Sequence, residues 1–324
     1  MARRAGAKRV LKNRMRILVT GAGGFIGARV CQLLAEQHPD AAVAAVTWPP
    51  TPSRPPALAR CEWLPCDLLE AGAETKLPDQ TDVVIHLAGD PRNPSGPGDF
   101  TAQILSNVVM TSRIADYAAR AKARLVVFAS SGAVYSGGLK TPFAEDSVAL
   151  PADHLGASKL AAESLLKARA QAGHFKALTF RIFTAYGPGA RPEQFVPQAI
   201  AKLRAVGGVA KFGNPEAKRD FIYVDDVARL IVAGLALRDA SIVYEALNAG
   251  TGRKTSVREV VQLLAGMMGT TKRIEFETPA AGQPASEHQA DMTRTLSTLD
   301  WRPRVSLEAG LRLTLDGPSA SGPV

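Results

Sequence analysis

The stretch RILVTGAGGFIG, residues 16–27, decides the fold of this chain. A short apolar run leads directly into a glycine-rich turn, and a helical pattern over 28–37 follows it. Glycine permits a tight turn and a close backbone approach to a ligand, and the N-terminus of the next helix attracts an anion. This order is typical of a site for the pyrophosphate of a dinucleotide. The spacing is GxxGxxG, and the predicted cofactor contacts in the turn are Gly21, Gly24, Phe25, Ile26 and Gly27.

Other short apolar runs alternate with helical patterns along the first half of the chain. Continuous β-branched runs are typical of strands that are buried on both faces, as in a parallel sheet. Alternating strands and helices form right-handed βαβ units, so we predict an α/β fold with a Rossmann-type, doubly wound, mainly parallel sheet. The predicted strands cover 16–20, 42–47, 82–87, 124–129, 177–183 and 244–248, and the predicted helices cover 28–37, 103–121 and 155–171.

The expected organisation has a large lobe and a smaller one. Residues 15–180, with about 220–250, form the predicted NAD(P)-binding domain. The remaining parts, about 181–219 and 251–316, form a smaller C-terminal α/β lobe. We expect a disordered basic extension over 1–14, a tail over 317–324, and loops over 49–56 and 92–98.

The composition is that of a globular protein with a large core. Of the 324 residues, 46% are apolar and 21% are charged, and no run approaches the ~20 apolar residues of a membrane span. The net charge of +9 is concentrated in residues 1–14, which contain basic but no acidic residues. The rest of the chain is nearly balanced and lacks the basic stripe of a nucleic-acid-binding protein. Met15 directly precedes the first predicted strand, so translation from Met15 is an alternative to translation from Met1.

The cysteines favour a reducing compartment. Cys31, Cys61 and Cys66 form neither an even set nor a CxxC pair. We therefore expect no disulfide framework and no metal site, and we expect a cytoplasmic protein with neither a membrane nor a nucleic acid as partner.

The end of the second predicted strand leaves the choice of cofactor open. An acidic residue at this place binds the ribose hydroxyls of NAD. This strand ends in Val46-Thr47-Trp48-Pro49, without a carboxylate. Arg54 follows closely and is a candidate ligand for the 2′-phosphate of NADP, with a solvated loop arginine as the alternative. NAD and NADP both remain candidates.

Further motifs follow the glycine turn in a set order: Cys66-Asp67-Leu68, His86-Leu87-Ala88-Gly89, SSGAVY at 130–135, RIFTAYGP at 181–188, RDFIYVDDVA at 219–228 and DWRP at 300–303. These six motifs resemble, one by one, motifs of the extended short-chain dehydrogenase/reductase family, which includes the NAD-dependent epimerases and dehydratases of nucleotide sugars. The family's versions are, in the same order, GDL, HLAA, SSxxVYG, RpfNvYGP, RDFIYVDDVA and LGW-P. The resemblance covers 15–316. It implies that the N-terminal domain binds the cofactor and that the smaller C-terminal lobe is the substrate-binding lobe. It also implies that Asp67, with Leu68, meets the adenine and that Leu87, Ala88 and Gly89 line the nicotinamide side.

The resemblance also implies a catalytic set from which one member is missing. Residues 151–163, PADHLGASKLAAE, are similar to PxxxYGASKLAAE, so Lys159 matches the lysine that holds the nicotinamide ribose. Ser131 matches the serine or threonine that contacts the reacting oxygen. Leu155 occupies the position of the catalytic tyrosine and has no proton to transfer. His154 is the candidate replacement because imidazole titrates near neutral pH, and Tyr135 is a second candidate.

Two further departures concern the substrate. Thr184 stands where the family has the asparagine that contacts the diphosphate of the sugar nucleotide, and the segment from Gln283 to Ser286 lacks the late arginine of RPGD. Arg219 is retained, and the predicted substrate contacts are Ser131, Thr184 and Arg219. The resemblance implies an NAD(P)-dependent epimerase/dehydratase-like homodimer that acts on a nucleotide sugar or related polyol through hydride transfer, with a non-standard proton carrier. The alternative is a non-catalytic NAD(P)-binding protein that acts as a sensor or assembly partner.

Overall fold

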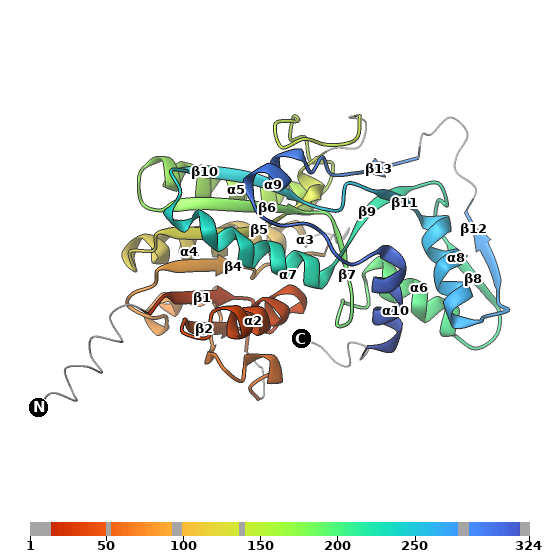
Figure 1. The fold of residues 1–324 in the computed structure, drawn as a ribbon, viewed down its shortest axis with the longest axis horizontal. Helices are drawn as coiled ribbons and strands as arrows, with labels where there is room; N and C mark the ends of the chain where they lie inside the picture. The colour runs from red at the N-terminus through yellow and green to blue at the C-terminus, as the bar shows by residue number, and fades with distance from the viewer. Residues whose placement is uncertain (1–13, 50–52, 93–98, 136–139, 278–284, 318–324) are drawn as a thin grey trace, which may run out of the picture.

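The computed structural model describes residues 14–49, 53–92, 99–135, 140–277 and 285–317, and its centre is a seven-stranded parallel sheet (Figure 1). The strand order is β10-β6-β5-β4-β1-β2-β3, so the chain starts in the middle of the sheet and winds outward in both directions. This is the doubly wound arrangement predicted from the sequence. The strands are β1 (Arg16–Thr20), β2 (Ala42–Thr47), β3 (Glu62–Pro65), β4 (Val83–His86), β5 (Leu125–Ser131), β6 (Lys176–Ile182) and β10 (Tyr244–Ala249).

Helices cover both faces of this sheet (Figure 1). On one face, α2 (Phe25–Gln37) and α7 (Val224–Ala233) bury Leu34 and Ile231 against alternate residues of the strands. On the other face, α4 (Met110–Arg120) and α5 (His154–Gln171) bury Ile114 and Leu166. Burial on both faces explains why the central strands are apolar without alternation.

A smaller lobe follows from the C-terminal half of the chain. β9 (Lys218–Tyr223) pairs with β7 (Thr184–Tyr186), β11 (Lys254–Ser256) and β13 (Glu287–His288), and β8 (Val209–Phe212) pairs with β12 (Arg273–Phe276). The core of this lobe contains Leu203, Phe212, Leu264 and Leu311. Its helices are α6 (Phe195–Arg204), α8 (Val257–Met268) and α10 (Leu307–Asp316), while α9 (Thr293–Thr298) lies beside β10.

The predicted helix over 103–121 differs from the observed one in its first half. The helical segment begins earlier, as α3 (Asp99–Gln103), and passes through a π-helical turn, Ile104–Val109, before α4 begins. The wider turn inserts an extra residue and brings the side chain of Asn107 into the protein interior, where it is 1% exposed.

Several expectations fall on residues that the structure does not describe. These are the basic extension up to residue 13, the centre of the loop over 49–56, nearly all of the loop over 92–98, Gln283 with Pro284, and the tail from 318 onward. Within the described ranges, no helix combines the length and the apolar composition needed to cross a membrane.

Candidate active site

The glycine turn between β1 and α2 contains two backbone contacts that exclude a side chain. Gly21 has φ +66°, and a Cβ on it would lie 2.7 Å from the backbone nitrogen of Ala88. A Cβ on Gly27 would lie 2.1 Å from the carbonyl oxygen of Gly21. The glycines therefore let the end of β1 pack directly against the segment after β4 and against the first turn of α2.

The first turn of α2 is open to an anion. Gly24 is its N-cap, no side chain caps it, and its first turn contains no acidic residue. The N–H groups at a helix start have no partners within the helix, and the helix dipole adds partial positive charge there. Gly24, Phe25 and Ile26 line a cleft at this point, so the turn fits the pyrophosphate of a dinucleotide.

The cleft, of about 390 Å³, extends from this turn across the carboxyl ends of β4, β5 and β6 to the start of α6. In an open α/β sheet, ligands bind at this edge. The structure brings most of the predicted site residues together here. Those that line the cleft are Gly21, Gly24, Phe25, Ile26, Gly27, Leu87, Gly89, Ser131, Lys159 and Thr184.

Lys159 is the most buried cation in the lining, with 7% of its surface exposed. Its Nζ donates a hydrogen bond of 2.9 Å to the carbonyl oxygen of Ala129 and lies 4.9 Å from the centre of the Phe128 ring. Burial lowers the pKa of Lys159 to about 8, against the attraction of the Glu163 and Asp90 carboxylates.

At the start of α5, the side chains of His154 and Leu155 point in different directions. Asp153 caps the helix, and its Oδ1 accepts a hydrogen bond of 2.7 Å from the nitrogen of Gly156. The helix is regular from His154 onward, so adjacent residues point about 100° apart. Leu155 lines the cleft, whereas His154 is exposed and its ring packs against Phe100. The structure therefore does not support His154 as the replacement for the tyrosine.

Tyr135, the second candidate, is also directed away from the cleft. Its hydroxyl donates to Oδ1 of Asn248 and accepts a hydrogen bond of 2.9 Å from Arg181. Burial raises the pKa of Tyr135 to about 12, so this phenol is a structural hydrogen-bonding group.

A buried network below the cleft fixes the end of β5. Arg181 donates to both carboxylate oxygens of Glu163, and the Ser130 hydroxyl, which lines the cleft, also donates to Glu163.

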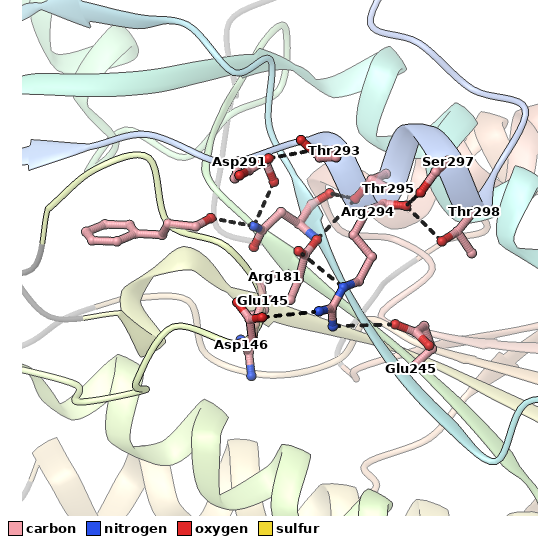
Figure 2. Close-up of polar contacts among 12 residues, drawn as sticks. Glu145, Asp146, Arg181, Glu245, Asp291, Thr293, Arg294, Thr295, Ser297 and Thr298 are labelled. Carbon is pink, nitrogen blue, oxygen red and sulfur yellow. Dashed lines mark hydrogen bonds and ion pairs between the residues drawn. The ribbon is translucent and has the colours of Figure 1, made fainter.

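Glu145 accepts a hydrogen bond of 2.8 Å from the nitrogen of Asn248. Figure 2 shows Arg294 of α9 directed toward the carboxylates of Glu145, Asp146 and Glu245, at 3.7–3.9 Å. The network joins α5, α9, β6 and β10 around the strand that ends in Ser131.

Other predicted cofactor residues lie outside the described lining of the cleft. The Arg54 Nε donates to the carbonyl oxygen of Leu58, and Oδ1 of Asp67 accepts from the nitrogen of Leu69. Leu68 is 5% exposed and belongs to the core. Ala88 contributes a backbone N–H, which donates to the hydroxyl of Thr20.

Arg219, the predicted phosphate contact, also lies outside this lining. Its guanidinium donates to the carbonyl oxygens of Lys218 and Ser286 and to the Ser286 hydroxyl. Burial lowers the pKa of Arg219, yet a guanidinium stays protonated in proteins.

The cleft also contains Arg191 and Gln194, which the sequence analysis did not single out. The Gln194 side chain accepts a hydrogen bond of 3.0 Å from the backbone nitrogen of Arg191. Burial acts to raise the pKa of Asp90, but the hydrogen bonds and charge of Arg92, with a smaller effect from the charge of Arg191, lower it. Both residues follow the YGP motif in a loop, and such a position has no periodicity that could reveal it.

The model of the NAD dependent epimerase/dehydratase family matches residues 17–250. The chain belongs to this family. A UDP-glucose 4-epimerase of Mycolicibacterium smegmatis is 30% identical over 310 residues, which cover 93% of this chain and 98% of that protein. The family is NAD-dependent, and the resemblance inferred from the motifs is confirmed.

Solved structures of family members have the same fold. The structure of MoeE5 in complex with UDP-glucuronic acid and NAD has a TM-score of 0.81 and 30% identity, and covers 93% of this chain and 98% of its own. A UDP-glucose 4-epimerase from Thermotoga maritima with UDP-glucose has a TM-score of 0.82 and 26% identity, with coverages of 93% and 98%. These enzymes confirm the Rossmann-type fold, and the relatives give no support to the non-catalytic alternative.

Proposed function

We propose that this family member is an NAD(P)-dependent enzyme that changes a carbon of a nucleotide sugar by reversible oxidation, as an epimerase, dehydratase or reductase. The observation that carries the proposal is that one cleft brings together the uncapped N-terminus of α2, the Ser131 hydroxyl and the Lys159 amine. Similarity to a UDP-glucose 4-epimerase and to structures with UDP-sugars and NAD supports it.

The side chains of the cleft have separate roles in this proposal. A bound nicotinamide dinucleotide supplies the acceptor and donor of hydride. The α2 N-terminus would hold its pyrophosphate, and Nζ of Lys159 would donate to its ribose hydroxyls. Ser131 Oγ, which accepts a hydrogen bond of 3.1 Å from Ala133 N, has its proton available to bond the reacting oxygen of the sugar. Leu155 presents an apolar surface beside that oxygen and excludes water.

Arg191 is the proposed contact for the diphosphate of the substrate. It lines the same cleft as the glycine turn, from the loop before α6, and a guanidinium pairs well with phosphate oxygens. Thr184 lines the same cleft, while Arg219 is held by Ser286. The substrate site therefore relies on the loop after YGP more than the sequence pattern alone implies.

The proposal is tested by identifying the dinucleotide that the purified protein holds. Native mass spectrometry, followed by denaturation and analysis of the released ligand, distinguishes three outcomes. Retained NAD(H) fits a cofactor that is regenerated within each turnover, and UDP- and dTDP-sugars are then assayed. Binding of NADP(H) by an empty protein points to a reductase and to Arg54. A protein that binds neither dinucleotide contradicts the proposal.

We also propose a homodimer in the cytoplasm that has small-molecule partners only. The helices α4 and α5 lie next to each other on one face of the sheet, and Leu165 of α5 is 37% exposed. The three buried thiols are unpaired, in keeping with a reducing compartment. Light scattering of the eluted protein gives its mass, and a Leu165→Glu variant that elutes as a monomer supports a dimer through this face.

A further inference from the structure

The position of Leu155 leaves the proposed reaction without its usual proton carrier. Oxidation of a sugar alcohol removes a proton from its hydroxyl as the carbon loses hydride, so an acceptor must stand near that oxygen. Leu155 lines the cleft and has no titratable atom. The search for the acceptor therefore moves to the other side chains of the cleft.

Most polar side chains in the described lining are unsuited to this role. The Ser130 hydroxyl is committed to Glu163, and serine and threonine hydroxyls do not ionise near neutral pH. The Tyr186 hydroxyl donates to the carbonyl oxygen of Leu307, and burial raises the pKa of Tyr186. Arg191 stays protonated, and Gln194 has no titratable group.

Lys159 has both the position and the chemistry. It lies one helical turn after Leu155, so both side chains are on one face of α5, and both line the cleft with Ser131. We propose that Nζ of Lys159 is itself the proton carrier of the reaction, an inference that rests on the proposed function. Lys159 is then a catalytic residue as well as a holder of the cofactor ribose.

The surroundings of Lys159 favour the neutral form of its amine. Burial lowers the pKa of Lys159 to about 8. The carboxylates that face it are Glu163, which is already paired with Arg181, and Asp90, which is paired with Arg92. His86 is close enough to feel the charge of Lys159, and burial together with this charge lowers the pKa of His86 to about 3, so this imidazole is neutral. Near neutral pH, the amine can therefore exist in both protonation states.

The proposed step balances in both directions. In oxidation, the O–H bond of the substrate breaks and its proton bonds to the lone pair of Nζ. The C–O bond becomes a carbonyl as the hydrogen on carbon leaves with its electron pair, for which a bound nicotinamide dinucleotide would be the acceptor. In the reverse direction, the ammonium of Lys159 returns its proton to the oxygen.

The first test uses the wild-type protein and does not depend on turnover. Brief acylation with acetic anhydride at a series of pH values, followed by peptide mass spectrometry, gives the titration midpoint of Lys159 in the cofactor-free and NAD-loaded protein. The exposed Lys122 serves as the internal reference for reagent reactivity. We expect a midpoint of about 8 without cofactor. A midpoint in the ordinary lysine range, about 10.4, overturns the proposal.

The second test uses Lys159→Arg, Leu155→Tyr and the double variant. Arginine keeps the positive charge but cannot release its proton, so Lys159→Arg should keep dinucleotide binding and lose about 100-fold or more in kcat. Leu155→Tyr should restore part of this activity in the double variant, because it returns a phenol to the site. A merely structural role for Lys159 predicts no such rescue.

The outcomes separate the inference from the proposed function. A Lys159→Arg enzyme with wild-type kcat and pH profile overturns the inference and leaves the proposed function standing. A wild-type protein that binds no dinucleotide overturns both. Support requires that the midpoint of the pH dependence of kcat for the oxidation coincides with the midpoint of the pH dependence of Lys159 acylation.

Discussion

Gly89 and Asn107 lie so close together that a methyl group on Gly89 would be 2.6 Å from Oδ1 of Asn107. The same methyl group would lie 3.2 Å from Nζ of Lys159. Asn107 reaches this place through the π-helical turn, and its side chain bonds the nitrogen and oxygen of Asp90 and the hydroxyl of Ser158. The end of β4 is thus held against α5 at the point where the lysine enters the cleft.

Gly89→Ala should destabilise the protein by about 1–3 kcal/mol, because the methyl group displaces Asn107 and the φ of +153° is unfavourable for alanine. It should also weaken dinucleotide binding. Urea denaturation gives the free energy of unfolding, and titration with NAD gives the affinity. Gly266→Ala in α8 is the control, since nothing lies within 4 Å of a Cβ there. That variant should be neutral or more stable by up to about 1 kcal/mol. Equal stability of the two variants would contradict the packing argument.

The buried ion pair between Arg181 and Glu163 should be sensitive to loss of one charge. Their side chains are 8% and 3% exposed, and Nη2 lies 2.9 Å from Oε2. Glu163→Gln leaves the guanidinium buried without its counter-charge and should cost about 3–5 kcal/mol of unfolding free energy. Glu70→Gln in the exposed pair with Lys76 is the matched control, and we expect it to cost less than about 1 kcal/mol. A small effect at Glu163 would mean that water enters this site.

The central sheet could be predicted from the sequence because burial on both faces leaves a signal. Continuous apolar runs gave β1 and β2 with their observed bounds, and the other predicted strands lie within two residues of the observed ones. β3 was missed, since its sequence Glu62–Pro65 is short, partly exposed and ends in proline. Among the described residues, the small strands β8 and β12 of the second lobe form a two-stranded sheet with each other and are partly exposed, so their apolar pattern is weak.

The parts of the site that belong to local sequence motifs could be predicted from the sequence. The glycine turn, Ser131 and Lys159 follow from local motifs, and the structure places them in one cleft. The sequence favours His154 because imidazole in general titrates near neutral pH, but one residue along a regular helix turns this side chain out of the cleft toward Phe100. Arg191 could not be predicted, because only the tertiary fold brings its loop into the cleft that the glycine turn also lines.

The three thiols should react slowly in the folded protein. Cys31, Cys61 and Cys66 are 0%, 3% and 3% exposed. A hydrogen bond to Cys61 together with burial raises the pKa of Cys31, and burial raises the pKa of Cys66, so little of either exists as thiolate at neutral pH. The same hydrogen bond lowers the pKa of Cys61, so the slow reaction expected of Cys61 rests on its burial alone. Ellman's reagent should therefore detect three thiols in denaturant and almost none in native buffer within the same time. Rapid reaction of two thiols in the native state would contradict the observed packing.

His86 should make the folded state less stable as the pH falls. It is fully buried, Nδ1 lies 2.7 Å from the Thr20 hydroxyl, and Nε2 lies 3.0 Å from the Thr111 hydroxyl. Burial lowers the pKa of His86 from 6.5 to about 3. Between these values the unfolded chain binds a proton that the folded state does not bind, so protonation favours unfolding. The stabilising effect of neutral His86 is thus complete above pH 6.5 and is lost as the pH falls toward 3.

For a single group of this kind, linkage gives a loss of about 2 kcal/mol between pH 7.5 and pH 5. His288 contributes with the same sign, because burial lowers the pKa of His288 to about 4, so the effect of His86 must be isolated by difference. Urea denaturation of wild type and His86→Asn at both pH values gives that difference, and the variant should lose about 2 kcal/mol less than wild type over the interval. His154→Ala, at an exposed position, is the control for removing a histidine side chain, and it should keep the wild-type unfolding free energy at pH 7.5 within about 0.5 kcal/mol. An equal change in unfolding free energy between the two pH values for wild type and His86→Asn would show that His86 binds its proton in the folded state as readily as in the unfolded one.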